Sequence, residues 1–452
     1  MNEVSTAPFD ERTGSWEGLE ADDASSISAR QLARAWQIAE RASESNGFYG
    51  STLGSLPAGR SQEDWEALPR TTKQDVVADC EAAPPYGRRW DDRHENVRSV
   101  VETSGTSGRG RAVFALNSTD ERAVHRTEAV GFWWAGARPG SRVHLTLPIG
   151  VTAAARWYDA GLRLLGANVL PVGTYPTDRK IELMQRYGTD LLIGTPTYLQ
   201  RLGVACDEAG VDPRSLGVRS LLVAGERYTR RWVEDIELAW GATLYEQYGC
   251  TERAIAWTCP GGVLQDGDWA VLHFPADAAL CEVVDPETGQ AVSSGEQGEL
   301  VVTPFSASGS PLIRYRTGDR VEWVEPGACC CGRPVAGIRP GRVERYDHMI
   351  KVRGVNIWPE SFDPLIFGVD GVGDYRGVVT TAPNGSEELV VEVECVPSEV
   401  DRVRAQIVDG IRRSLGLGVK VEACEPGDLA RRVPEGFVKV ARWRDDRSSV
   451  RS

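Results

Sequence analysis

The sequence lacks any apolar run that approaches the ~20 residues required for a membrane-spanning helix, so we expect no membrane partner. The first residues, through Asp23, are acidic and lack the apolar segment of a signal peptide. A cytoplasmic protein is therefore the expectation. The chain has 452 residues and a hydrophobic fraction of 41%, which is enough for a large core and more than one domain.

Positive charge is scarce as well. Lysine and arginine number 51 against 65 acidic residues, a formal net charge of −14. Such a surface repels a polyanion, and we expect no nucleic acid as a partner. A nucleotide is not excluded, because it needs only a local cationic pocket.

Two nucleotide-binding signatures are also missing. The chain has no GxxxxGK[ST] loop, and no GxGxxG opens a βαβ unit near its start, which argues against P-loop NTPases and dinucleotide-dependent oxidoreductases. Ten cysteines in a cytoplasmic protein do not predict a disulfide framework. They are scattered apart from the run 329–331, which indicates either a metal site or a buried turn.

Helical and strand-like patterns divide the chain. From about Thr6 to Asp75 the sequence is expected to be helical, with helical spacing in ARQLARAWQIAERA. From Val143 onward, apolar runs that end near glycine or proline (HLTLPIG, DLLIGTP, SLLVAGE) alternate with helical stretches, which predicts a mostly parallel α/β sheet with ligands at the strand ends.

The later part of the chain has a different texture. Short strands and turns follow Ala279, and CEVVDPETGQAV predicts a hairpin with its turn at Pro286 to Gly289. After about Arg345 a strand, a helix and a strand follow within a short stretch (ELVVEVEC, VDRVRAQIVDGIRRSLG, VKVEAC). We therefore expect a large N-terminal domain, residues 1–345, with a β-rich subdomain, and a small mobile α+β C-terminal domain, residues 346–452.

Residues 103–111 read TSGTSGRGR. Glycines let the backbone approach an anion, and hydroxyl and guanidinium groups donate to phosphate oxygens. A polar surface loop is the alternative reading of the same residues.

Downstream segments complete a recognisable series: YEQYGCTE (245–252), YRTGD (315–319), RYDHMIKVRGVNIWP (345–359) and VKVARWRD (438–445). In this order and at this spacing they closely resemble the adenylate-forming superfamily of acyl-CoA synthetases, adenylation domains and luciferases, from about Ser99 to Asp445. With GTPTYL (194–199), PLIRYRTGD and the cysteine run, the chain is similar to the phenylacetate–CoA ligase branch. Those enzymes activate aromatic acids with ATP and transfer them to coenzyme A.

The resemblance implies roles for matching residues. Thr251 would lie by the α-phosphate, Glu252 would coordinate Mg²⁺, and Asp319 would bind the ribose hydroxyls. Lys439 would stabilise charge in the adenylation step, although valine replaces the usual glycine before it. The implied nucleotide-binding residues are Thr103, Ser104, Gly105, Thr106, Ser107, Gly108, Arg111, Ala224, Gly225, Glu226, Tyr248, Gly249, Asp319 and Arg345. Arg111 stands where the family usually has lysine, which keeps the charge but changes the geometry.

The resemblance also implies a hinge and an acyl pocket. Asp347 would be the hinge about which the C-terminal domain rotates after adenylation. Glu344-Arg345 stands where the family usually has Gly-Arg, and Gly341-Arg342, three residues upstream, is the alternative match. The acyl pocket would be lined by Tyr158, Thr195, Pro196 and Tyr198, with the Tyr158 ring packing on the substrate. Ordinary core packing is the alternative for Tyr158.

Cys259, His273, Cys329 and Cys331 could bind a structural zinc ion, since some relatives of this branch carry a metal here. Cys330 or Cys281 could replace one ligand. A cluster of reduced, buried thiols is the other reading, and the residues leave both open.

The sequence therefore predicts an AMP-forming acid–thiol ligase that uses ATP, Mg²⁺ and coenzyme A, with an aromatic acid as its small-molecule partner. Transfer to the phosphopantetheine thiol of an acyl or peptidyl carrier protein, or to a non-thiol nucleophile, is the first alternative. An inactive nucleotide-binding or scaffold homologue is the second. A homodimer is compatible with each of these functions.

Overall fold

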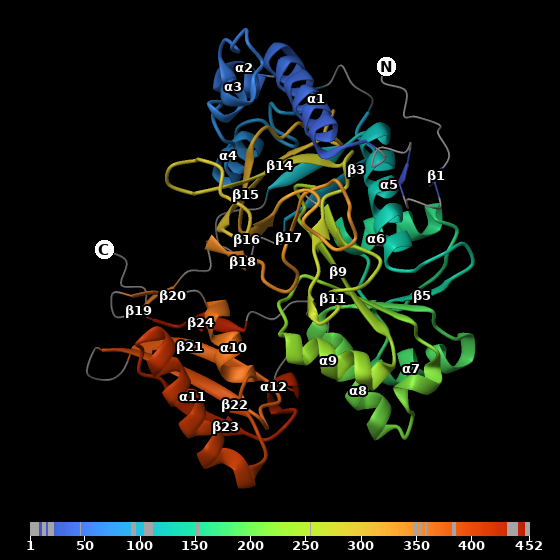
Figure 1. The fold of residues 1–452 in the computed structure, drawn as a ribbon, viewed down its shortest axis with the longest axis vertical. Coiled ribbons are helices and arrows are strands. Elements are labelled where there is room, and N and C mark those ends of the chain that lie inside the picture. The colour runs from blue at the N-terminus through green and yellow to red at the C-terminus, as the bar shows by residue number, and fades with distance from the viewer. Residues whose placement is uncertain are drawn as a thin grey trace. The chain divides into compact units, whose positions relative to one another are not determined.

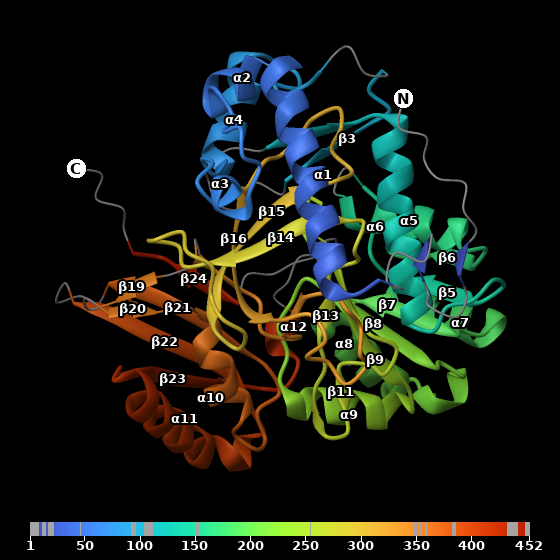
Figure 2. The same cartoon turned by 45° about the horizontal axis from the view of Figure 1, so that its top comes forward.

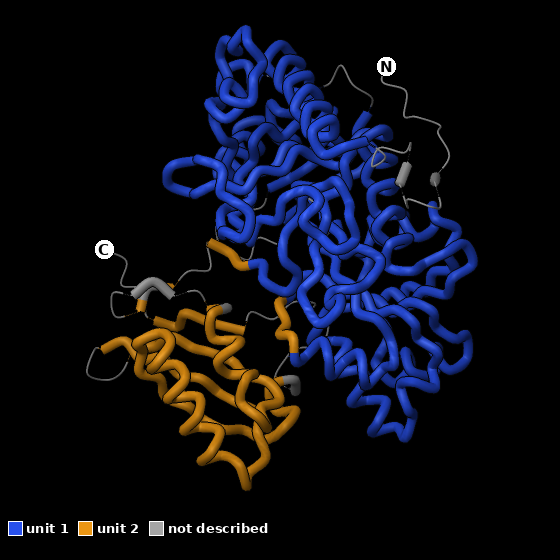
Figure 3. The backbone as a smooth tube through the Cα atoms, in the orientation of Figure 1, with its two compact units in different colours: residues 1–226, 231–343 blue, residues 227–230, 344–452 orange. Residues whose placement is uncertain are grey.

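A computed structural model describes residues 9–10, 15–16, 22–45, 47–91, 96–103, 112–150, 153–253, 255–346, 350–352, 355–357, 359–381, 386–431 and 442–447. The chain divides into two compact units (Figure 3). Unit 1 comprises residues 1–226 and 231–343, and unit 2 comprises residues 227–230 and 344–452. The division at 343/344 lies two residues before the domain boundary expected at 345.

One large sheet organises unit 1, in the order β14-β15-β16-β17-β13-β10-β9-β8-β7-β5-β6 (Figure 1). Its parallel half consists of β5 (Arg142–Leu145), β6 (Asn168–Pro171), β7 (Leu191–Gly194), β8 (Ser220–Ala224) and β9 (Thr243–Gly249). The strands β7 and β8 are almost continuously apolar and buried, as expected for parallel strands covered on both faces.

Helices connect these parallel strands. They are α6 (Ala153–Leu164), α7 (Thr177–Tyr187), α8 (Pro196–Glu208) and α9 (Arg230–Trp240), and α5 (Ser118–Trp134) packs against α6 and β10. The start of α8 is fixed locally. The hydroxyl of Thr195 accepts from the Tyr198 backbone N–H, and Pro196 occupies the first helical turn, where its missing N–H costs no hydrogen bond.

The other half of the sheet is antiparallel. It contains β10 (Ile255–Thr258), β13 (Leu272–His273), β17 (Gly337–Ile338), β16 (Tyr315–Val324), β15 (Gln297–Pro304) and β14 (Ala279–Val284). The hairpin expected after β14 is confirmed: the Gly289 N–H donates to the Asp285 carbonyl, and Gly289 adopts a φ of 75°. A glycine suits this turn because a side chain is strained at positive φ.

The N-terminal region corrects one expectation. Helices do not fill residues 6–75: β1 (Phe9–Asp10) pairs with β2 (Ser15–Trp16), and the helical segment begins only at Ala24. The helices are α1 (Ala24–Ser45), α2 (Gly47–Leu53), α3 (Gln62–Glu66) and α4 (Lys73–Ala82). The helical spacing of ARQLARAWQIAERA is confirmed within α1, which runs along β14 (Figure 2).

Three further short strand pairs are present, the first two in unit 1 and the third in unit 2. They are β3 (Ser99–Glu102) with β4 (Val113–Leu116), β11 (Leu264–Gln265) with β12 (Asp268–Trp269), and β19 (Ile350–Val352) with β20 (Val355–Ile357). None of the helices within the described ranges combines the length and the apolar character that crossing a membrane requires.

Unit 2 contains a sheet of order β23-β22-β21-β24. The predicted strand–helix–strand unit is confirmed as β22 (Glu387–Glu394), α11 (Val400–Leu415) and β23 (Lys420–Cys424), with β22 and β23 parallel. The remaining elements are β18 (Glu344–Arg345), α10 (Asp363–Phe367), β21 (Tyr375–Thr381), α12 (Asp428–Arg431) and β24 (Trp443–Asp445). The apolar face of α11, which includes Val403, Ile407 and Ile411, packs against this sheet.

Candidate active site

The strands β3 and β4 lead into and out of the predicted phosphate loop. They pair in register from Ser99 to Glu102, and beyond them the backbone N–H of Thr103 donates to the carbonyl of Ala112. The hydroxyl of Thr103 accepts in turn from the Ala112 N–H at 3.0 Å. Of the residues predicted to bind phosphate, Thr103 is described. The others lie outside the described residues: Ser104, Gly105, Thr106, Ser107, Gly108 and Arg111.

Thr251 and Glu252 occupy a tight turn that follows β9. The Arg253 N–H donates to the Cys250 carbonyl, and Arg253 has a φ of 71°, which is uncommon for a residue with a side chain. Arg253 is 1% exposed, and its guanidinium donates to the carbonyls of Ser306 and Ser310. Burial lowers the pKa of Arg253 from its usual value, although an arginine remains charged at neutral pH. Arg253 therefore holds the backbone that presents Glu252.

Each of two predicted carboxylates accepts a hydrogen bond from a tyrosine of the other motif. The hydroxyl of Tyr315, at the start of β16, donates to Glu252 Oε1 at 2.9 Å. The hydroxyl of Tyr248, near the end of β9, donates to Asp319 Oδ2 at 2.5 Å. Glu252 is 8% exposed and Asp319 is 4% exposed, so both carboxylates are largely removed from solvent. Charge-assisted hydrogen bonds of this kind fix the orientation of a carboxylate.

The segment 224–226 lies beside the start of α8. Gly225 adopts a φ of 81°, and Glu226 Oε2 accepts from the backbone N–H of Thr197 at 3.0 Å. The structure therefore brings the predicted adenine segment, Ala224 to Glu226, next to Thr195, Pro196 and Tyr198. The Tyr198 ring also lies 4.5 Å from the Nζ atom of Lys180, on the neighbouring helix α7.

The structure places Tyr158 in the core. It is 1% exposed, packs edge-on against Phe132 with ring centroids 5.5 Å apart, and donates its hydroxyl to Gln247 Oε1 at 2.5 Å. Burial raises the pKa of Tyr158 well above its usual value, so the hydroxyl stays protonated.

The four predicted metal ligands converge. Cys259 follows β10, His273 ends β13, and Cys329 and Cys331 lie in the loop between β16 and β17. Their ligand atoms all lie within 4.8 Å of one another, and the Sγ atoms of Cys259 and Cys329 are 3.8 Å apart. Ligands at ~2.3 Å from zinc in a tetrahedron are separated by about that distance.

The surroundings of this cysteine–histidine cluster also suit a metal. His273 Nδ1 lies 3.3 Å from the carbonyl of Val335, which leaves Nε2 facing the Cys331 thiol at 3.2 Å. A metal-ligating histidine commonly donates its second ring N–H to a carbonyl in this way. Cys330 is exposed and donates to Gln265. Cys281 lines a cavity outside the cluster, so neither takes the place of a predicted ligand.

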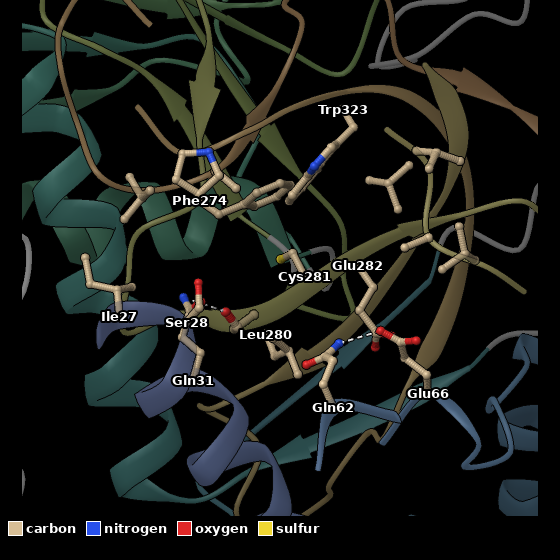
Figure 4. Close-up of a pocket in the computed structure, with 18 of the residues that line it drawn as sticks. Ile27, Ser28, Gln31, Gln62, Glu66, Phe274, Leu280, Cys281, Glu282 and Trp323 are labelled. Carbon is tan, nitrogen blue, oxygen red and sulfur yellow. Dashed lines mark hydrogen bonds between the residues drawn. The ribbon is translucent and has the colours of Figure 1, made fainter. Parts of the chain in front are cut away.

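That cavity has a volume of about 250 Å³ and lies between α1, β14 and the loop that leaves the cysteine–histidine cluster (Figure 4). Phe274 and Trp323 form an apolar wall, and Gln31, Gln62 and Glu66 form a polar rim. Burial raises the pKa of the Cys281 thiol, which argues against a reactive thiolate. The lining of this cavity includes neither Glu252 nor Asp319.

The remaining predicted residues are in unit 2 or outside the described ranges. Arg345 lies in β18 of unit 2. The hinge residue Asp347 and the predicted catalytic Lys439 lie outside the described residues.

Three residues of this site were missed from the sequence: Tyr315, Arg253 and Gln247. All three lie within or directly beside the quoted motifs, and that position was the available signal. Their hydrogen bonds depend on how distant segments meet, which no local pattern indicates.

Comparisons with known proteins agree with this geometry. Residues 58–306 match the AMP-binding enzyme family, and residues 354–447 match the AMP-binding enzyme C-terminal domain. Phenylacetate-coenzyme A ligase of Thermus thermophilus is 28% identical over 408 residues, covering 85% of this chain and 89% of that protein. The enzyme of the same name from Pseudomonas putida is 27% identical over 383 residues, covering 82% of each.

A solved structure of a CoA ligase is also similar to this chain. A structure of 2-hydroxyisobutyryl-CoA ligase in the postadenylation state, in complex with R3-HIB-AMP, has a TM-score of 0.85 and 25% sequence identity. The similarity covers 99% of this chain and 95% of that one.

Proposed function

The chain belongs to the AMP-binding enzyme family, in its phenylacetate–CoA ligase-like branch, and from that premise we propose that it activates an aromatic carboxylic acid with ATP and transfers the acyl group to coenzyme A. At the coarser level it is an AMP-forming acid–CoA ligase. The observation that carries the proposal is the pair of buried carboxylates, Glu252 and Asp319, each oriented by a tyrosine of the other motif.

The chemistry explains why such positioning matters. A carboxylate is a poor electrophile, because a thiol cannot displace oxide from it. Attack of the carboxylate on the α-phosphate of ATP gives a mixed anhydride with AMP and releases pyrophosphate. The thiol then attacks the acyl carbon, and AMP leaves. Since two anions must meet in the first step, catalysis depends mainly on positioning and charge neutralisation.

The residues take roles in this scheme. Glu252 would ligate Mg²⁺, which neutralises phosphate charge when bound. Among the described residues it accepts one hydrogen bond, from Tyr315, which leaves carboxylate lone pairs for a ligand. Asp319 would accept the ribose hydroxyls. Thr103 and the residues after it would hold the outer phosphates, with Ala224 to Glu226 beside adenine and Lys439 at the reacting carboxylate.

We also propose a structural role for zinc. Three thiolates and one imidazole leave no open coordination position, which is typical of a structural rather than a catalytic site. Zinc would join the ends of β10 and β13 to the loop between β16 and β17. It would supply cohesion between these elements and no step of the reaction.

The test is acid-dependent ATP–pyrophosphate exchange with benzoate, phenylacetate, anthranilate and hydroxybenzoates, followed by thioester formation with coenzyme A. The proposal expects exchange with at least one aromatic acid and a coenzyme A thioester as product. Exchange without a coenzyme A thioester would favour a carrier-protein or non-thiol acceptor. Absence of exchange with every acid, in folded protein, would contradict the activity.

A further inference from the structure

Glu128 is a carboxyl group enclosed in the core of unit 1. It lies on α5, it is 0% exposed, and neither of its oxygens has a hydrogen-bond partner within the part of the chain that the structure describes. Burial raises the pKa of Glu128 well above its usual value, which favours the protonated form, and a protonated carboxyl can both donate and accept a hydrogen bond. Buried polar groups in native proteins are nearly always paired. Within the described residues Glu128 therefore lacks the partner that a buried carboxyl usually has, and a bound ligand could supply it.

Glu128 adjoins the residue predicted to line the acyl pocket. A Cβ atom on Gly161 of α6 would lie 2.5 Å from the Cβ of Glu128, so the two helices are in close contact there. Tyr158 lies three residues before Gly161 on α6, so the two residues share one side of that helix. Tyr158 is therefore on the side of α6 that approaches Glu128.

A second unpaired polar atom lies close by. The indole Nε1 of Trp257 is buried and has no hydrogen-bond partner among the described residues. A Cβ atom on Gly131, one turn after Glu128 on α5, would lie 2.3 Å from that nitrogen. The face of α5 that carries Glu128 and Gly131 therefore borders both a neutral carboxyl and a free N–H donor.

Polar groups connect this region with the exposed end of β9. The Tyr158 hydroxyl donates to Gln247 Oε1 at 2.5 Å, and a Cβ atom on Gly249 would lie 2.7 Å from Gln247 Nε2. Gly249 is exposed and directly follows Tyr248, whose hydroxyl orients Asp319. Polar side chains therefore lie between the predicted nucleotide-binding motif and the side of α6 that approaches Glu128.

We propose that Glu128, together with Tyr158 and Gln247, recognises a neutral hydrogen-bonding substituent, a hydroxyl or a carboxamide, on the acid that the enzyme activates. This inference rests on the proposed function and names its substrate class more closely. A hydroxyl matches a neutral carboxyl because each offers one donor and acceptor capacity. A bare phenyl or alkyl group would leave Glu128 unpaired, and sites built to bond a substrate hydroxyl discriminate strongly against the analogue that lacks it.

Matched acids test this directly in the wild-type protein. Pyrophosphate exchange is measured with benzoate against its 2-, 3- and 4-hydroxy and 4-carbamoyl derivatives, and with phenylacetate against the corresponding hydroxyphenylacetates. At least one substituted acid should exceed its parent about tenfold or more in kcat/KM. Exchange with equal or greater efficiency for every unsubstituted parent overturns this inference alone. Failure of exchange with every acid overturns the proposed function as well.

Variants identify the residue responsible. Glu128→Gln keeps a donor and an acceptor and should retain the preference within a few-fold. Glu128→Leu should reduce the preference to near unity while the unsubstituted parent is still activated. Thr127→Val, at the adjacent buried position of α5, is the matched control and should keep the wild-type preference. If Glu128→Leu keeps that preference, Glu128 is only a structural residue and the inference fails. If Glu128→Leu does not fold, the wild-type comparison and Glu128→Gln still decide.

Discussion

The Tyr315 hydroxyl donates to Glu252 Oε1 at 2.9 Å across 63 residues of sequence. Tyr248 makes the converse bond to Asp319, at 2.5 Å across 71 residues. Each bond links the two motifs, because the tyrosine of one motif donates to the carboxylate of the other. The carboxylates proposed to bind the ion and the ribose therefore depend on the same packing of β9 against the β-rich part of unit 1.

Removal of the Tyr315 hydroxyl should weaken the metal site. In Tyr315→Phe, Glu252 loses its orienting bond, and we expect the Mg²⁺ concentration for half-maximal pyrophosphate exchange to rise about tenfold, the usual effect of one bond to a charged group. A Mg²⁺ titration at saturating ATP and acid measures it. Tyr245→Phe is the matched control, since its hydroxyl donates to the carbonyl of Pro260 instead. An unchanged Mg²⁺ titration in Tyr315→Phe would contradict the role given to Glu252.

Removal of the Tyr248 hydroxyl should affect a different quantity. Asp319 would keep its charge in Tyr248→Phe but lose the bond that orients Oδ2. We expect the KM for ATP to rise about tenfold, while the Mg²⁺ dependence stays close to wild type. The informative comparison is with 2′-deoxy-ATP, which lacks one ribose hydroxyl and should lose less affinity in the variant than ATP does. Equal losses of affinity for both nucleotides would show that Asp319 does not bind the ribose hydroxyls.

The cysteine–histidine cluster predicts one zinc ion per chain in protein purified without added metal, measured by elemental analysis. Cys259→Ser and His273→Ala should lose the metal and lower the melting temperature, because the ends of two strands and a loop would no longer be joined by the ion. Cys330→Ser is the matched control, since the Cys330 side chain is exposed and outside the set. Protein that is folded and free of metal before any chelator is added would contradict the proposal.

How far the sequence predicted the molecule depended on whether a signal was local. Apolar runs ending in glycine or proline, such as DLLIGTP, predicted the parallel strands, because a strand buried on both faces has few other compositions. The N-terminal expectation was wrong before Ala24, since the helical spacing seen in α1 was extended over polar residues that do not share it.

The site divides in the same way. Glu252 and Asp319 could be predicted as site residues because motif order and spacing are visible in the chain. Their tyrosine partners were not found as partners, because a bond across 63 residues depends on strand order in the sheet. The burial of Glu128 could not be predicted from the sequence, because a single glutamate in a helical pattern usually lies on the solvated surface. Its burial depends on the close approach of α6 at Gly161.

Acid should destabilise the protein through His144. This residue of β5 is fully buried, and burial together with the charge of Arg142 lowers its pKa from 6.5 to about 4. The unfolded chain then binds a proton more readily than the folded one, so stability is intact above about pH 6.5 and is lost as the pH falls towards 4. Between pH 7 and pH 5, the difference in proton binding at His144 should lower the free energy of unfolding by about 2 kcal/mol. Urea titrations at pH 7 and pH 5 measure this loss of stability, which should be smaller in His144→Gln. An equal loss in the variant would show that another group causes it.

Lys439 should separate the two halves of the reaction. Its ammonium would stabilise charge as the carboxylate attacks the α-phosphate, whereas attack of the thiol on a preformed adenylate needs no such bridge. Lys439→Ala should therefore lose acid-dependent pyrophosphate exchange by several orders of magnitude, yet convert a supplied acyl-adenylate and coenzyme A to thioester at a rate near wild type. Lys420→Ala is the matched control, because Lys420 forms an exposed ion pair with Glu422 on β23. Equal loss of both half-reactions in Lys439→Ala would show that the lysine supports the fold or the thioester step rather than adenylation alone.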